Sequence, residues 1–116
     1  MHSAALPLCL LLAVASPAAA QPGTYLPVAD AVAAIADGKP WAGTRPDGGP
    51  VRLTLHANGS GRFEGPVTRD ITWAIRGEEL CIALGLPLGS RCLRFRRHGH
   101  GFAAHAAGEP AFTLSR

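Results

Sequence analysis

Residues 71–97 read ITWAIRGEELCIALGLPLGSRCLRFRR and carry the clearest β pattern of the chain. Apolar and polar side chains alternate through 71–76, 79–84 and 91–97, which is the period of a half-buried strand. Gly77 and Glu78 supply a tight turn between the first two segments. The pattern predicts three successive antiparallel strands with a core face made by Trp73, Ile75, Leu80, Ile82, Leu93 and Phe95.

Two cysteines fix how the second and third of these segments pair. If Leu80 lies opposite Leu93 on the apolar face, Cys81 lies opposite Cys92 on the other face. Directly opposed strand residues have Cβ atoms at about the separation that a disulfide needs. The sequence therefore predicts a Cys81–Cys92 disulfide, worth roughly 2.5–3 kcal/mol to a small domain through the entropy of the unfolded chain.

The N-terminal segment has the features of a secretory signal peptide. Residues 4–15 are apolar, Pro17 follows them, and Ala18, Ala19 and Ala20 supply a small-residue cleavage site. Removing 1–20 also removes Cys9 and leaves an even number of cysteines, as expected in an oxidising compartment. We therefore expect a periplasmic or secreted protein with no transmembrane segment in its mature chain.

The rest of the chain predicts one β-rich domain over 27–116. Residues 21–26 are expected to form a flexible leader, and 28–37 to form one short helix with Val28, Val32 and Ile35 on its apolar side. Short alternating segments separated by glycine-rich turns follow it. The expected fold is mainly β, an antiparallel meander of six to seven strands that forms a small barrel or sandwich.

The turn at Asn58 and Gly59 determines the pairing of the strands on either side of it. A two-residue turn would place Leu55 opposite Arg62, which is on the wrong face. We therefore predict a three-residue loop with a bulge, with Leu55 opposite Phe63.

Two clusters of side chains could bind ions. Arg91, Arg94, Arg96 and Arg97 form the densest group of charges, and guanidinium groups suit phosphate, sulfate or lipid headgroups. The alternative is a solvated face that keeps a strand from associating with other strands. A second cluster, His98, His100 and His105, could bind a metal ion, although its first two members flank a glycine-rich turn and have no nearby carboxylate or thiolate in the sequence.

The composition and motifs favour a non-enzymatic protein without a cofactor. The acidic residues, among them Asp70 and Glu79, lie at turns and strand ends, and neither Ser60 nor Ser90 lies in a nucleophile motif. Net charge is +3, and the few aromatic residues do not alternate with basic ones as in a nucleic-acid stacking surface. Ten of the eleven basic residues are arginine, which together with abundant alanine, glycine and proline indicates a bacterial source.

Trp73, Gly77, Leu80, Cys81 and Cys92, preceded by the turn NGSG at 58–61, form a pattern that resembles a group of small secreted proteobacterial β-barrel proteins. The resemblance covers about 41–116 and implies a lipocalin-like barrel. More distantly, the chain is similar to the barrel inhibitors of bacterial metalloproteases, which act through an extended N-terminus. This chain departs from them because a helix precedes its barrel and leaves only the short arm 21–26.

We therefore expect a binding domain of the cell envelope, stabilised by one disulfide, whose partner is a small ligand in the barrel or a protein on its surface. The first alternative is an inhibitor of a protease or another hydrolase. The second alternative is a small enzyme.

Overall fold

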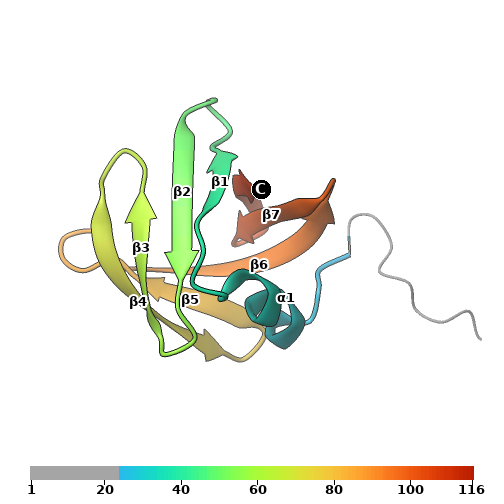
Figure 1. The fold of residues 1–116 in the computed structure, drawn as a ribbon, viewed down its shortest axis with the longest axis horizontal. Helices are drawn as coiled ribbons and strands as arrows, with labels where there is room; N and C mark the ends of the chain where they lie inside the picture. The colour runs from blue at the N-terminus through green and yellow to red at the C-terminus, as the bar shows by residue number, and fades with distance from the viewer. Residues whose placement is uncertain (1–23) are drawn as a thin grey trace, which may run out of the picture.

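The structure is a computed structural model and describes residues 24–116. The predicted signal peptide, 1–20, lies outside these residues. One helix precedes eight strands (Figure 1): α1 Val28–Ile35, β1 Trp41–Thr44, β2 Pro50–Leu55, β3 Ser60–Glu64, β4 Arg69–Arg76, β5 Glu79–Ala83, β6 Ser90–His98, β7 Gly101–Ala106 and β8 Glu109–Leu114.

The strands form one antiparallel meander that nearly closes into a barrel. Each strand pairs with the next one in the chain, in the order β1 to β8. β8 returns to β1, where the backbones of Ala42 and Ser115 exchange two hydrogen bonds of 3.0 and 2.6 Å. The predicted mainly β meander with one short helix is thus confirmed, as a near-barrel of eight strands.

The structure has eight strands, more than the six to seven we predicted, and two of these strands have an irregular apolar pattern. β3 contains Gly61, whose added Cβ would lie 2.4 Å from the carbonyl oxygen of Thr54, so this inward position has no side chain. In β8 a bulge disturbs the alternation, since Ala104 pairs with Phe112 and His105 pairs with Pro110.

The pairing of β2 with β3 differs from our prediction. His56 and Ser60 flank the three-residue loop 57–59, as their backbone hydrogen bond of 2.9 Å shows. However, Leu55 pairs with Gly61, and it is Leu53 that pairs with Phe63. The predicted Leu55–Phe63 pair is therefore wrong by two residues, and the glycine leaves room for the buried Leu55 side chain.

The central hairpin has the predicted register and disulfide. Leu80 pairs with Leu93 and Cys81 with Cys92, and the two sulfur atoms are bonded. Leu80, Ile82, Leu93 and Phe95 are all buried in the core, and Trp73 is half-buried against it.

We predicted Ile75 in the core, but this prediction is wrong, because 44% of its surface is exposed. β3 pairs with β4 only as far as Thr72, so the last residues of β4 pair only with β5. Ile75 lies in this part of β4, opposite Leu80, where β3 no longer flanks the strand. An alternating pattern indicates the face of a side chain but not whether neighbouring strands extend far enough to cover it.

The helix covers one end of the barrel. Ala31, Val32 and Ile35 are buried in the same core as the inward-facing strand residues, and Figure 1 shows α1 beside the end of β2. The helix ends at Ile35, two residues before the predicted end. Asp37 instead accepts a hydrogen bond from the backbone of Lys39 at 3.1 Å, a local bond that competes with a further helical turn.

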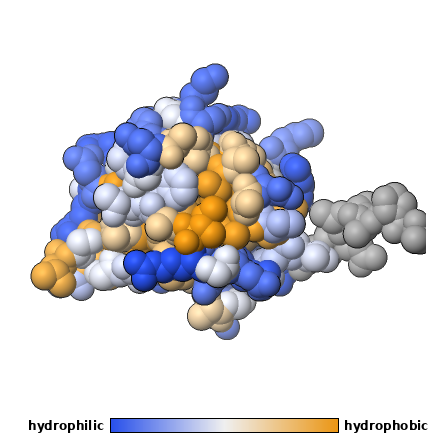
Figure 2. All heavy atoms as spheres, turned by 90° about the horizontal axis from the view of Figure 1, so that it is seen from below, coloured by the Kyte–Doolittle hydropathy of each residue, from blue (hydrophilic) through white to orange (hydrophobic). Residues whose placement is uncertain are grey.

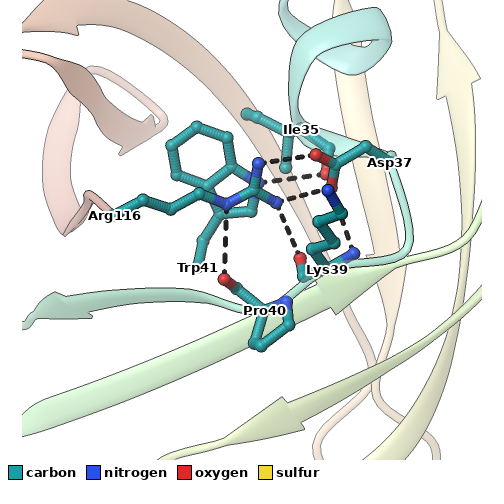
Figure 3. A network of polar contacts seen from close by, with 6 residues as sticks. All are labelled: Ile35, Asp37, Lys39, Pro40, Trp41 and Arg116. Atoms are coloured by element: carbon teal, nitrogen blue, oxygen red, sulfur yellow. Dashed lines mark hydrogen bonds and ion pairs between the residues drawn. The ribbon is translucent and has the colours of Figure 1, made fainter.

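A polar network holds the chain's last residue against the connection between α1 and β1 (Figure 3). The Arg116 guanidinium pairs with the Asp37 carboxylate and donates to the carbonyl oxygen of Lys39 at 2.9 Å. It also lies 3.8 Å from the centre of the Trp41 ring, and the Trp41 indole donates to the carbonyl oxygen of Ile35 at 3.2 Å. The network therefore fastens β8 to α1 and β1 beside the closing seam.

The segment before the helix is also attached to the barrel. Tyr25 forms a β-bridge with Arg96, and the Leu26 amide donates to the carbonyl oxygen of Phe95 at 2.7 Å. Leu26 is buried. Our expectation of a flexible leader over 21–26 is thus wrong for these two residues, because Leu26 has a place in the core.

Candidate functional site

The end of the barrel opposite α1 contains a cavity of about 410 Å³. Its wall is apolar and is formed by inward-facing residues of four strands and the residue that follows β5: Phe63, Ile82, Leu84, Leu93, Ala111 and Phe112. Pro66, Val67 and Leu88, from the β3–β4 and β5–β6 loops, extend the wall outward. We call this cavity and its loops the mouth. An eight-stranded barrel is just wide enough to be filled by its own side chains or to hold one small ligand.

The bulge in β8 explains part of the empty space. Ala104 pairs with Phe112 and His105 with Pro110, so Ala111 has no partner of its own on β7. As a result Ala111 and Phe112, although consecutive, both line the cavity. Ala111 contributes only a methyl group to the wall, whereas a larger side chain there would extend into the cavity.

Three arginines line the same cavity: Arg45, Arg69 and Arg91. Arg45 forms an ion pair of 3.3 Å with Asp47. Arg69 donates to the carbonyl oxygens of Leu84 and Leu86 at 3.1 and 3.0 Å, and its charge has no carboxylate partner among residues 24–116. The cavity therefore combines an apolar wall with positive charge and has no acidic residue in its lining.

Arg91 is the arginine of this group whose donors are free. It is exposed at the start of β6 and has no hydrogen bond or ion pair of its side chain within the described part of the chain. A guanidinium group with free donors can bind a carboxylate, phosphate or sulfonate through two parallel hydrogen bonds.

The structure separates the four arginines that the sequence suggested as one anion-binding cluster. Only Arg91 lines the mouth. The guanidinium carbons of Arg94 and Arg96 each lie 4.4 Å from the centre of the Tyr25 ring, on the outer face of the barrel. Arg97 lies 5.7 Å from the centre of the Phe102 ring. Side chains two residues apart on a strand share a face, but here Tyr25 occupies the face of Arg94 and Arg96.

The three histidines do not assemble into a metal centre. His98 and His100 are exposed at the β6–β7 turn, whereas His105 is half-buried, pairs with Arg94, and packs its ring 5.8 Å from that of Tyr25. Across residues 24–116, no group of three His, Cys, Asp or Glu side chains could hold a metal ion.

The acidic residues considered for catalysis are also placed in other roles. Asp70 forms an ion pair of 2.9 Å with Arg62 on the surface, and Glu79 lies at the start of β5, opposite Arg76 in the strand register and away from the mouth. The inhibitor alternative needs a free arm before the barrel, but Tyr25 and Leu26 are held on β6.

Sequence reasoning found Ile82, Leu93 and Arg91 but did not combine them into one site. It missed Arg45 and Arg69, which are far from Arg91 in the sequence and meet it only because the barrel curls. A signal for both exists: each arginine adjoins a Gly/Pro-containing loop at the same end of the meander. Trp73 and Phe95, which share the predicted core face with Ile82, do not line the cavity.

Comparison with protein-family models, curated proteins and solved structures finds no match to this chain. No helix within residues 24–116 is long and apolar enough to cross a membrane. The properties of the mouth are therefore the basis for a functional conclusion.

Proposed function

We propose that this protein binds a small amphipathic anion in the mouth of its barrel. The apolar part of the ligand occupies the cavity, and its anionic group binds the arginines at the rim. One observation carries the proposal: an apolar cavity of about 410 Å³ has three arginines and no acidic residue in its lining. This volume lies in the range of small-molecule sites, roughly 300–1,000 Å³.

The charge arrangement favours an anion over a neutral ligand. A neutral apolar molecule would fill the cavity but would leave Arg91 without a partner. Arg69 is positioned by two backbone carbonyl oxygens, which orient its guanidinium group without cancelling its charge. A carboxylate, phosphate or sulfonate next to these two groups gains charge-assisted hydrogen bonds.

The binding protein is non-enzymatic in this proposal, and it acts in the periplasm or outside the cell. The disulfide supports this location, since such bonds persist in oxidising compartments. The lining of the cavity contains arginines but no carboxylate, histidine or thiol that could act as a general acid or base, which supports binding over catalysis.

The test compares decanoate with decanol, which differ in the charge of the head group. We expect wild type to bind decanoate more tightly, and Arg91→Gln to weaken decanoate binding by about tenfold or more while leaving decanol binding unchanged. The measurement is isothermal titration calorimetry. Arg76→Gln is the matched control, because Arg76 is exposed in the last position of β4, at the other end of the barrel.

A second variant tests the cavity itself. Ala111→Trp fills the space and should abolish binding of both probes, while circular dichroism shows an unchanged β spectrum. The proposal is overturned if wild type binds neither probe, if it binds both with equal affinity, or if the folded Ala111→Trp variant binds as wild type does.

A further inference from the structure

We infer that the loops around the mouth are a docking surface for a membrane that contains anionic lipid. Three large apolar side chains project from these loops into solvent. Leu86 is 91% exposed and Leu88 45% exposed, both on the β5–β6 loop, and Val67 is 39% exposed on the β3–β4 loop. The apolar atoms at the left tip of Figure 2 lie where Figure 1 places the β5–β6 loop.

The exposed leucine is held in position by hydrogen bonds. The Arg69 side chain, at the start of β4, donates to the carbonyl oxygen of Leu86 at 3.0 Å. The loop is closed by backbone hydrogen bonds from Leu84 to Gly89 at 2.8 Å and from Gly89 to Gly85 at 2.9 Å. The β3–β4 and β5–β6 loops are thus joined into one unit that presents Leu86 outward.

The charge of these two loops fits an anionic surface. Residues 65–69 and 84–91 contain two arginines, Arg69 and Arg91, and no acidic residue. Apolar side chains flanked by basic ones are the combination that binds the interface of anionic bilayers, because the apolar groups enter the acyl boundary while the cations meet phosphates. The arginines would remain at headgroup depth beside the inserted leucine.

A lipid surface explains this arrangement better than a protein partner. The apolar side chains protrude separately from two loops, whereas a stable protein interface needs a continuous surface of about 800 Å² on each partner. Protruding single residues can each enter a fluid bilayer without a shaped counterpart.

The docking surface adjoins the proposed ligand site. Val67, Leu88, Arg69 and Arg91 also line the cavity, so an amphipathic anion in the outer part of a leaflet would meet the open mouth directly. This last link rests on the proposed ligand binding. The docking itself does not, because Leu86 is exposed whether or not the cavity is occupied.

The test is co-sedimentation of the exported protein with vesicles. One set contains equal parts of phosphatidylglycerol and phosphatidylcholine, and the other contains phosphatidylcholine alone. We expect binding to the anionic set, a decrease at high salt, and a loss of about tenfold or more for Leu86→Asp.

Ile75 supplies the matched control. It is the remaining large apolar residue with an exposed side chain among residues 24–116, and it lies at the α1 end of the barrel with 44% exposure. Leu88→Asp should lower vesicle binding, whereas Ile75→Asp, at nearly the same exposure, should not. Far-ultraviolet circular dichroism checks that both variants fold.

Membrane docking and ligand binding can be tested separately with the same variants. The cavity-filled Ala111→Trp variant should lose decanoate and keep vesicle binding. The inference is overturned if wild type binds neither set of vesicles, if Leu86→Asp and Ile75→Asp behave alike, or if Leu86→Asp dissociates a dimer in sedimentation velocity without changing lipid binding.

Discussion

At the scale of single residues, Arg116 combines an ion pair, a hydrogen bond and a ring contact in one network. Its guanidinium pairs with Asp37, donates to the Lys39 carbonyl oxygen and stacks on Trp41 (Figure 3). Hydrogen bonds from Arg116 hold the pKa of the Asp37 carboxyl well below its ordinary value of 3.8. The charged form of Asp37 is therefore favoured in the folded protein relative to the unfolded chain.

This lowered pKa predicts how stability depends on pH. A group whose folded pKa is depressed stabilises the protein above its unfolded pKa, and that contribution is lost as the pH falls toward the folded value. We expect wild type to be more stable than Asp37→Asn at pH 7, and the difference to shrink as the pH falls below 3.8. Urea unfolding at a series of pH values measures it.

Glu109→Gln is the control for this prediction, because Glu109 is exposed and forms no ion pair within the described residues. The difference in the free energy of unfolding between wild type and Glu109→Gln should stay nearly constant over the same pH range. A pH-independent difference for Asp37→Asn would contradict the role of its charge.

At the scale of secondary-structure elements, Tyr25 attaches the segment before α1 to β6. The guanidinium carbons of Arg94 and Arg96 each lie 4.4 Å from the centre of its ring. The Nε atoms of both arginines are buried without a hydrogen-bond partner in the described part of the protein. The ring contacts therefore stabilise guanidinium groups that have partly lost their water.

Removal of this ring should loosen the attachment locally. We expect Tyr25→Ala to accelerate hydrogen exchange of the Leu26 amide, which donates to Phe95, by about 5- to 30-fold, since cation–π contacts of this kind contribute about 1–2 kcal/mol. Tyr25→Phe keeps the ring and should exchange like wild type. Equal exchange in Tyr25→Ala and wild type would show that the backbone bond alone holds the segment.

Sequence patterns predicted the strands and their register more completely than the exposure of single side chains on them. The register of the central hairpin followed from two pairs, Leu80–Leu93 and Cys81–Cys92, because these positions satisfy the apolar face and the disulfide together. Ile75 and Tyr25 were misplaced because their exposure depends on where a neighbouring strand ends and on a contact from a distant segment. The alternation of apolar and polar residues within one strand indicates neither where the neighbouring strand ends nor which distant segment covers it.

For the molecule as a whole, the barrel depends on the seam between β1 and β8. Gly43 is the residue that allows the two strands to approach, because a Cβ added there would lie 1.5 Å from the carbonyl oxygen of Thr113. We expect Gly43→Ala to destabilise the protein by about 1–3 kcal/mol, since the backbones must separate to accept the methyl group. Urea unfolding provides the measurement.

Ala42→Ser is the control for the seam, since the neighbouring Ala42 is exposed and its backbone bonds to Ser115 do not involve the side chain. This variant should unfold within about 0.5 kcal/mol of wild type. A Gly43→Ala protein as stable as wild type would mean that the seam opens at little cost.

The meander could be predicted from the sequence, but the site could not. Each hairpin is local, so its strands follow from alternation and turn residues. The mouth gathers Arg45 from the β1–β2 connection, Arg69 from the start of β4 and Arg91 from the start of β6. Their meeting requires the curvature that brings β8 back to β1. The empty space also depends on the β8 bulge at Ala111, whose sequence context contains no marker of it.

The most direct test of ligand binding in the mouth is a ¹⁵N-resolved NMR titration of the exported protein with decanoate. We predict shifts of the amides of Ile82, Leu84, Arg91 and Phe112, which lie at the cavity, and unchanged amides in α1. Shifts centred on α1 or on the Tyr25 face, or no shifts at saturating decanoate, would contradict the account.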